Sequence, residues 1–320
     1  MIPGLIAFVA AVGFGVAARE AGPRIGAMDR PSGPLKQHTE PVSYLGGLAV
    51  ALAIAVGMIA CGWPLRTASV LGLAAALVLG LVDDAIELRP VFRLSLQVIL
   101  AVAIVAGGVR ADGLPDVLAW IVAVALFVAA MNGVNLVDGM DGLAAGAVVI
   151  SAVGLAAISH AHGGGTGLAL VTGGAAAGFL LHNLPPARLF LGDGGAYFLG
   201  AVTAVLVLHA GDAGRTLPGA LTCLGLFALD PALAILRRRV RGARLTEGDR
   251  GHLYDQLNAR GLGPVACLAL SWAIHTGFVV AGVASSSLHV VGALVLCLAS
   301  WVVAGVLLLA LGFLTYAPES

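Results

Sequence analysis

The chain passes from one long apolar run into another through the stretch Asn132-Gly-Val-Asn135-Leu-Val-Asp138-Gly-Met-Asp141-Gly142. Its amides and carboxylates lie at an apolar boundary, where ionisable groups are costly unless they are hydrated, paired or bound to a ligand. If the stretch is helical, a spacing of three places these four side chains on one slowly turning face. The glycines beside the carboxylates let a ligand approach the backbone closely. The stretch is therefore the first candidate for a functional site.

Composition indicates an integral membrane protein of the helical type. Of the 320 residues, 59% are hydrophobic and 11% are charged, whereas a soluble domain is about 45–50% apolar and about 25% charged. Uncharged runs of near 20 residues are typical of spanning helices rather than of a β-barrel. The formal net charge is zero, so no nucleic acid is expected as a partner.

We predict an all-α, polytopic helix bundle with eleven membrane spans, or alternatively ten, in a single domain over residues 1–320. The spans are expected at roughly 2–20, 44–62, 65–82, 92–109, 116–137, 142–161, 165–184, 194–210, 216–236, 263–283 and 287–313. The segments 19–43, 83–93, 183–193 and 237–262 hold fourteen of the seventeen Lys and Arg residues.

This basic side is expected to be cytoplasmic, with the N-terminus outside and the C-terminus inside. The cytoplasmic loops are expected at about 21–43, 83–92, 183–193 and 237–262. Every acidic motif falls on the same side, and the outer side carries only Asp112, Asp116 and Asp212. We therefore expect an active site on the cytoplasmic face that is open laterally to the bilayer.

Asp83 and Asp84 close the third expected span. Adjacent carboxylates repel each other, and the helix dipole adds to the cost at a C-terminus. A cation is expected to offset that cost, either Mg²⁺, which prefers oxygen ligands and arrives with phosphates, or the nearby Arg89 and Arg93. The alternative is a helix end that frays into water with local ion pairs. The pattern Asp-Asp-x-x-Glu, ending at Glu87, also resembles the diphosphate-binding motif of prenyl-transferring enzymes.

Two further segments have a functional and a structural interpretation. Lys36 lies in a Pro-rich loop before Gly46 and Gly47, which is either a phosphate-holding loop at a helix start or a solvated basic connector. Asp193 opens the eighth expected span, where it either caps the helix N-terminus or holds a metal beside flexible glycines.

The last basic loop carries Arg250 and His252. His252 beside Arg250 could bind or protonate a phosphate, although a loop histidine is more often only solvated. Asp230 is an acid within the ninth expected span, and we expect it to pair with one of the nearby arginines.

Together these motifs resemble the polyprenyl-phosphate N-acetylhexosamine-1-phosphate transferases, glycosyltransferase family 4. That family includes the bacterial phospho-MurNAc-pentapeptide transferase and the undecaprenyl-phosphate GlcNAc-1-phosphate transferase. The resemblance is carried, in order, by Leu45-Gly46-Gly47, Asp83-Asp84, Asn132-x-x-Asn135-x-x-Asp138-Gly-x-Asp141-Gly, Asn183 ten residues before Asp193, and His252 in a basic loop.

The resemblance implies that a polyprenyl (undecaprenyl) phosphate attacks the β-phosphate of a UDP-N-acetylhexosamine, giving polyprenyl-diphospho-sugar and UMP with Mg²⁺, or alternatively Mn²⁺. It implies a multi-pass enzyme of the bacterial inner membrane, at the first membrane step of a cell-envelope glycan pathway. The implied roles are metal binding by Asp193, catalysis by Asp83, Asp84 and His252, with Asp83 as the base, and substrate binding by Lys36, Asn135, Asp138, Asp141, Asn183 and Arg250.

The chain departs from the family pattern in two places. After Asp84 it reads Ala-Ile-Glu-Leu-Arg-Pro, without the lysine of the peptidoglycan enzyme, which points to the GlcNAc-type branch. The histidine-rich motif is reduced to His252-Leu-Tyr254-Asp255, so the sugar is left open. A membrane prenyltransferase with Asp-rich motifs is one alternative function. A transporter without chemistry is another, and it predicts inverted repeats with broken helices. Small-residue faces permit a homodimer.

Overall fold

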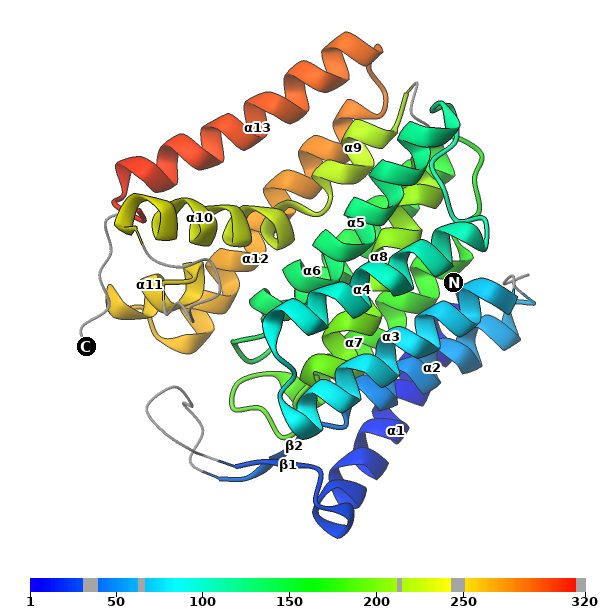
Figure 1. The fold of residues 1–320 in the computed structure, drawn as a ribbon, viewed down its shortest axis with the longest axis vertical. Coiled ribbons are helices and arrows are strands. Elements are labelled where there is room, and N and C mark those ends of the chain that lie inside the picture. The colour runs from blue at the N-terminus through cyan, green and yellow to red at the C-terminus, as the bar shows by residue number, and fades with distance from the viewer. Residues whose placement is uncertain (31–39, 63–66, 212–214, 243–250, 315–320) are drawn as a thin grey trace.

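The computed structural model describes residues 1–30, 40–62, 67–211, 215–242 and 251–314. These residues form thirteen helices and one short antiparallel strand pair (Figure 1). The elements are α1 (Ile2–Ile25), β1 (Met28–Asp29), β2 (Val42–Ser43), α2 (Gly46–Ala60), α3 (Thr67–Ile86), α4 (Pro90–Ala106), α5 (Asp116–Val137), α6 (Leu143–Ala161), α7 (Gly167–Asn183), α8 (Gly192–Ala210), α9 (Leu217–Thr222), α10 (Gly225–Arg241), α11 (Leu253–Ala259), α12 (Pro264–Ser285) and α13 (Val290–Ala310).

Among the described helices, α1, α3, α5, α6, α8, α12 and α13 are long and apolar enough to cross a membrane. Helices α2, α4 and α7 are shorter apolar helices of 15 to 17 residues. The chain is therefore a polytopic membrane helix bundle, as its composition predicts. The number of spans, their orientation and the single domain stay predictions.

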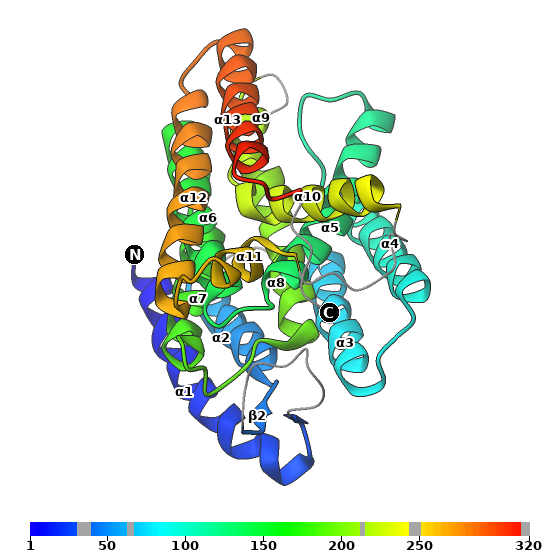
Figure 2. The same ribbon diagram turned by 90° about the vertical axis from the view of Figure 1, so that its left-hand side faces the viewer.

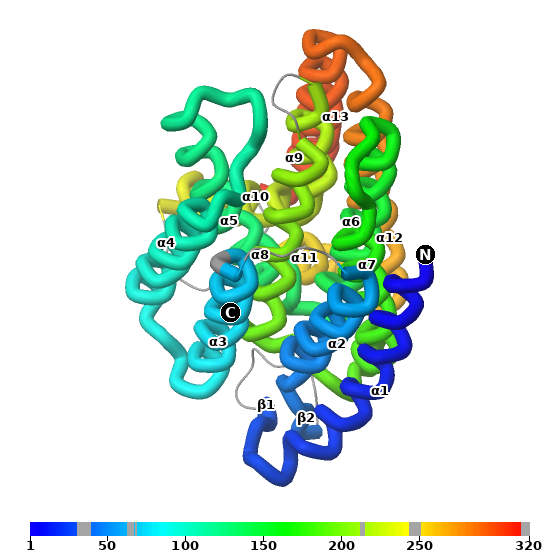
Figure 3. Tube along the Cα trace, turned by 90° about the vertical axis from the view of Figure 1, so that its right-hand side faces the viewer, coloured from blue at the N-terminus to red at the C-terminus, as the bar shows by residue number. Residues whose placement is uncertain are grey.

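Helix α8 lies at the centre of the bundle. In its apolar stretch 89% of the residues are buried inside the protein, against 17% for α1 and for α13. Helices α2, α3, α5 and α6 all pack against it, and Figure 3 shows α2 and α3 beside it. The first turn of α8 is thus held by the core of the molecule.

Glycines bring α2 and α3 into backbone contact with the start of α8. A Cβ atom on Gly47 would collide with the backbone of Gly195, and one on Gly80 would collide with the backbone of Asp193. Small residues at helix contacts allow this approach in membrane proteins. The position of Asp193 is therefore set by backbone packing from two neighbouring helices.

The first backbone N–H groups of α2 are hydrogen-bonded to carbonyl groups of the protein. The N–H groups of Gly46 and Gly47 donate to the carbonyls of Phe190 and Leu191, at 2.9 and 2.8 Å. The phosphate-holding role of the loop around Lys36 stays a prediction, because residues 31–39 lie outside the described residues, but the two amides at the start of α2 do not face a phosphate. They bind the segment that leads into α8 instead.

The span expected at 216–236 is divided into α9 and α10, which corrects the prediction of one continuous helix there. Side chains from two other helices satisfy the backbone at the break. The Ser151 hydroxyl donates to the Cys223 carbonyl at 2.8 Å, and the Leu226 N–H donates to Nδ1 of His275 at 3.1 Å. Beyond the break, α10 runs across the direction of α12 and α13 (Figure 2).

Helix α3 continues beyond its expected end at residue 82. Asp83 and Asp84 consequently lie in its last turn rather than after it. The helix ends before Glu87, whose φ of 48° is left-handed. Left-handed residues commonly end helices, although glycine is the usual choice.

Candidate active site

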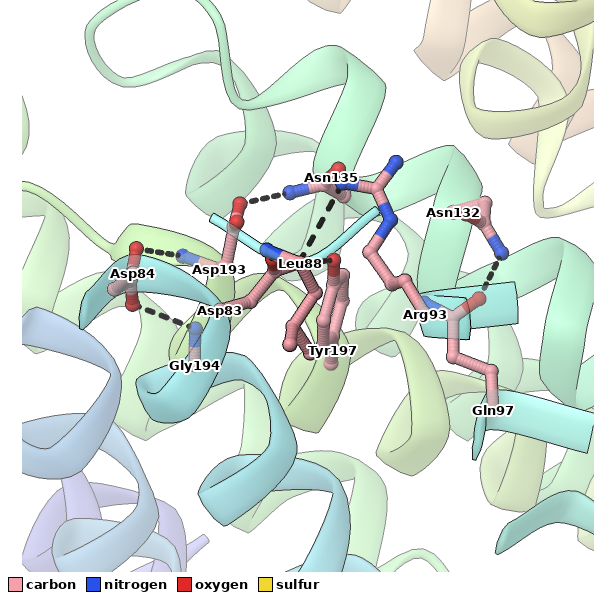
Figure 4. Close-up of polar contacts among 10 residues, drawn as sticks. All are labelled: Asp83, Asp84, Leu88, Arg93, Gln97, Asn132, Asn135, Asp193, Gly194 and Tyr197. Atoms are coloured by element: carbon pink, nitrogen blue, oxygen red, sulfur yellow. Dashed lines mark hydrogen bonds and ion pairs between the residues drawn. The ribbon is translucent and has the colours of Figure 1, made fainter. Parts of the chain in front are cut away.

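Three helices bring polar side chains together beside the first turn of α8 (Figure 4). Asp83 and Asp84 come from the last turn of α3, Asn135 from the last turn of α5, and Asp193 from the first turn of α8. Asp83 is buried and the other three are half-buried. Residues from distant parts of the chain therefore converge, as the sequence predicts.

Asp84 caps the N-terminus of α8. Its Oδ1 accepts the N–H of Asp193 at 2.9 Å, and its Oδ2 accepts the N–H of Gly194 at 3.0 Å. The first amides of a helix lack partners within the helix and carry the positive end of its dipole, so a carboxylate is stabilised there. The cap of this helix is thus Asp84, and Asp193 does not have that role.

Asp83 is held in place by three groups. The Leu88 N–H donates to its Oδ1 at 2.8 Å, and the Tyr197 hydroxyl donates to its Oδ2 at 2.6 Å. Arg93 lies 3.5 Å from Oδ2 and forms an ion pair with it. The carboxylate is only 3% exposed, so the arginine partly offsets the cost of its burial.

Asp193 lies where negative charge is concentrated. Its Oδ1 accepts a hydrogen bond from Nδ2 of Asn135 at 2.5 Å. Three other carboxyl groups repel its negative charge, those of Asp83, Asp84 and Asp138. Because like charges at this proximity disfavour ionisation, the site favours a bound cation.

The turn after α5 supplies two further carboxyl groups. The helix ends at Val137, so Asp138 and Asp141 lie in a turn and not on a continuing helix face. Burial raises the pKa of the Asp138 carboxyl well above its ordinary value, and the negative charges of Asp193, Asp84 and Asp141 raise this pKa further. The turn thus adds carboxyl groups whose ionisation a bound cation would favour.

Asn183 and Asp141 fasten this turn to the segment between α7 and α8. Asn183 is 3% exposed. Its Oδ1 accepts the Gly142 N–H, and its Nδ2 donates to the Leu189 carbonyl, both at 2.9 Å. Oδ2 of Asp141 accepts the Ala187 N–H at 2.9 Å. Both residues therefore join two loops of the site, and their direct contact with a nucleotide stays a prediction.

Gln97 of α4 is a partner that sequence reasoning missed. It is fully buried, and its Oε1 accepts a hydrogen bond from Nδ2 of Asn132 at 2.6 Å. Figure 4 shows this pair beside Arg93 and away from Asp193. A lone amide in an apolar span was the available signal. Asn132 accordingly ties α5 to α4.

His252 is buried against an acid that the sequence assigned to an arginine. Its Nδ1 lies 2.5 Å from Oδ2 of Asp230, which is 2% exposed, and the Leu253 N–H donates to Oδ1 of Asp230 at 2.7 Å. An acid within an apolar span was the signal for a partner. In the structure this partner is the histidine of the next loop and not an arginine, which corrects the expectation.

Tyr254 connects His252 to the turn after α5. The two rings stack with centroids 5.7 Å apart and an interplanar angle of 9°. The hydroxyl of Tyr254 packs directly on Gly139, where a Cβ atom would collide with it. The start of α11 therefore packs on the segment that carries Asp138 and Asp141.

The predicted site residues fall into four groups. At the start of α8 lie Asp83, Asp84, Asn135 and Asp193. The adjoining loops hold Asp138, Asp141 and Asn183, and His252 contacts the turn after α5 through Tyr254. The last group, Lys36 and Arg250, lies outside the described residues.

The donor set suits a metal that is shared with a substrate. Within the described ranges, no group of three or more His, Cys, Asp or Glu side chains could hold a metal ion. Mg²⁺ needs no such cage, because it is usually bound by one or two carboxylates and completes its shell with water and substrate phosphates. The half-buried Asp193, with repelling carboxylates around it, fits this kind of site.

Known proteins with similar sequences carry related activities. The model of glycosyl transferase family 4 matches residues 67–211. The chain is 31% identical over 266 residues to a probable undecaprenyl-phosphate N-acetylglucosaminyl 1-phosphate transferase of Bacillus subtilis (strain 168), covering 75% of this chain and 72% of that protein.

Two other relatives extend the comparison. A decaprenyl-phosphate N-acetylglucosaminephosphotransferase of Mycolicibacterium smegmatis is 30% identical over 267 residues, which is 69% of this chain and 66% of that protein. A phospho-N-acetylmuramoyl-pentapeptide-transferase of Gloeothece citriformis is 32% identical over 174 residues, which is 51% of this chain and 46% of that protein. The chain therefore belongs to glycosyl transferase family 4 and is a membrane enzyme that transfers sugar phosphates.

Proposed function

We propose that this enzyme transfers N-acetylhexosamine 1-phosphate from a UDP-sugar to a polyprenyl phosphate and releases UMP. The observation that carries the proposal is the gathering of Asp83, Asp84 and Asp193 around the first turn of α8. Relatives named for undecaprenyl- or decaprenyl-phosphate acceptors and N-acetylglucosamine support this substrate pair. They favour the GlcNAc type over the muramoyl-pentapeptide type.

In the proposed reaction, a phosphate oxygen of the lipid forms a bond to the β-phosphorus of the UDP-sugar. The bond from that phosphorus to the bridging oxygen breaks, and UMP leaves with the electron pair. Phosphoryl transfer depends mainly on alignment and on neutralisation of charge. Bound Mg²⁺, or Mn²⁺ in its place, would supply that neutralisation at the diphosphate oxygens.

The chain's own residues would divide this work. Asp193 would hold the metal, and its hydrogen bond with Asn135 orients the carboxylate. Asp84 keeps the start of α8 in register with α3. Both oxygens of Asp83 accept hydrogen bonds, which makes this buried carboxylate a weak nucleophile.

The lipid substrate itself favours direct attack. A phosphate monoester has its second pKa at about 6, so it is largely dianionic at neutral pH and needs little help from a base. We therefore propose direct attack by the lipid phosphate without a covalent enzyme intermediate, and a positioning role for Asp83 in place of the role of base. The basic loops favour the cytoplasmic face of a bacterial inner membrane as the place of reaction.

The test is UMP release by purified protein with Mg²⁺, undecaprenyl phosphate and a panel of donors. UDP-GlcNAc, UDP-MurNAc-pentapeptide and UDP-linked 6-deoxy-N-acetylhexosamines would be compared. We expect lipid-dependent release with an N-acetylhexosamine donor and its loss on metal chelation. Asp116→Asn is a matched control, because this carboxylate is 93% exposed on another part of the chain.

Two results would contradict the proposal. One is the absence of UMP release with every donor in protein shown to be folded. The other is release of inorganic diphosphate from a prenyl diphosphate, which would identify a prenyltransferase instead.

A further inference from the structure

We propose that Asp230 is a positioning residue that sets the orientation and proton arrangement of His252 for the transfer reaction. This inference rests on the proposed function and deepens it. It assigns a purpose to a buried acid that belongs to no motif of the site.

Asp230 holds His252 at two points. Its Oδ2 lies 2.5 Å from Nδ1 of the imidazole, and its Oδ1 accepts the N–H of Leu253 at 2.7 Å. One carboxylate therefore fixes both the ring and the first residue of α11. Asp230 and His252 are 2% and 7% exposed, so bulk water competes little for these bonds.

The hydrogen bond between Asp230 and His252 also determines which imidazole nitrogen carries a proton. Oδ1 of Asp230 already accepts the Leu253 N–H, and Oδ2 of the same carboxylate faces Nδ1 of the ring. A carboxylate can only accept, and Nδ1 of His252 must therefore be the donor. The second nitrogen, Nε2, is then the atom whose protonation can change, and it is the one suited to a phosphate oxygen.

The same histidine is connected to the carboxylate turn. Tyr254 stacks on it, with the ring centroids 5.7 Å apart, and packs its hydroxyl on Gly139. A shift of the imidazole would consequently disturb a segment that lies between Asp138 and Asp141. Asp230 thus acts on the site through His252.

Burying the Asp230 carboxylate costs free energy, which argues against a role in packing alone. A carboxylate removed from water is destabilising unless it is paired, and replacing a buried ion pair by apolar residues is often neutral or stabilising. Asp230 lies in α10 directly before Pro231, among buried leucines. An apolar side chain would suit that position better if packing were its only task.

The test is a double-mutant cycle with Asp230→Asn and His252→Gln. We expect Asp230→Asn to lower kcat about 10- to 100-fold, with the KM for the UDP-sugar changed less than about threefold. If Asp230 acts through His252, the double variant is no slower than His252→Gln alone. Multiplying losses, or an unchanged kcat in Asp230→Asn, would overturn the proposal. Asp116→Asn is the matched control and should keep kcat.

A second readout does not need turnover. In protein labelled with ¹⁵N-histidine, we expect one strongly downfield Nδ1–H resonance that disappears in Asp230→Asn and in His252→Gln but persists in Asp116→Asn. Its absence from the unsubstituted protein would overturn the inference whatever the activity. Its presence in protein that releases no UMP would instead reject the proposed function and leave the Asp230–His252 bond established.

Asp230→Glu keeps the test decisive if Asp230→Asn does not fold. The longer side chain retains the charge but displaces the oxygens by one methylene. We expect kcat to fall about tenfold while the resonance shifts. An unchanged kcat together with a shifted resonance would contradict a positioning role.

Discussion

Asp84 and Asp230 both accept hydrogen bonds from protein groups on each of their two carboxylate oxygens, but they position different parts of the molecule. Asp84 accepts two backbone amides at the start of α8. Asp230 accepts one hydrogen bond from a backbone amide and one from the imidazole of His252. The first carboxylate places a helix end in the core, and the second places a titratable side chain in a loop.

This difference separates two kinds of dependence. The carboxylate side of the site is continuous with α8, the most buried of the candidate spans. The histidine side is reached by α10 and by the short α11, after the break at Cys223. Substitutions at the caps of α8 should therefore change stability and activity together. Substitutions around His252 should change activity more than stability.

The largest expected effect is that of Asp193→Asn. An amide cannot supply the negative charge that a Mg²⁺ site needs, so UMP release should fall at least about 1,000-fold. The amide oxygen can still accept the bond from Asn135, so the thermal unfolding temperature should change little. Turnover near the normal rate in this variant would remove Asp193 from the metal site.

Asp84→Asn should be next in size. Its amide nitrogen would face a backbone N–H of α8, leaving one donor without an acceptor at a cost of about 1–3 kcal/mol. Activity should fall about 10- to 100-fold because Asp193 begins the same helix turn. Thermal unfolding and UMP release would be measured on the same sample. Equal activity loss at unchanged stability would mean that Asp84 contacts the substrate directly.

Gly139→Ala probes the contact between the two sides. The added methyl group would collide with the Tyr254 hydroxyl, so kcat/KM should fall about tenfold through misplacement of the start of α11. Tyr254→Phe in the same chain removes the hydroxyl and should restore part of the loss. If the double variant stays as slow as Gly139→Ala, the collision is not the cause.

Glu87→Gly should have the smallest effect, and it should stabilise the fold, whereas the other substitutions lower activity or stability. Glu87 is exposed with φ of 48°, a conformation that glycine adopts without steric cost, so unfolding should become about 0.5–1 kcal/mol less favourable. UMP release should stay within about twofold of normal. Glu20→Gly, within the exposed part of α1, is the control and should destabilise by about 1 kcal/mol. A large loss of activity in Glu87→Gly would revive the Asp-Asp-x-x-Glu motif of prenyl-transferring enzymes.

The helices were predictable because an uncharged run of about 20 residues has few alternatives in lipid. Ten of the eleven expected spans correspond to one described helix each. The ninth did not, since its break depends on Ser151 and His275 from helices that are distant in sequence. Hydropathy carries no trace of such partners.

The candidate site was predictable in its members and not in its connections. Asp83 and Asp193 stand out because acids are rare in apolar sequence. Which carboxylate caps α8, and which acid holds His252, follows from tertiary packing alone. The same limit hid Gln97, whose partner Asn132 lies on the next helix.

At Gly47 and Gly80 the backbones of α2 and α3 touch the backbone of α8 directly, with no side chain in between at these two points. A contact between two helix backbones cannot be widened by a substitution without moving a whole helix. Adaptation of this enzyme to a different sugar is therefore expected to proceed from His252 and Tyr254, whose side chains pack beside the carboxylate turn and can be exchanged one at a time.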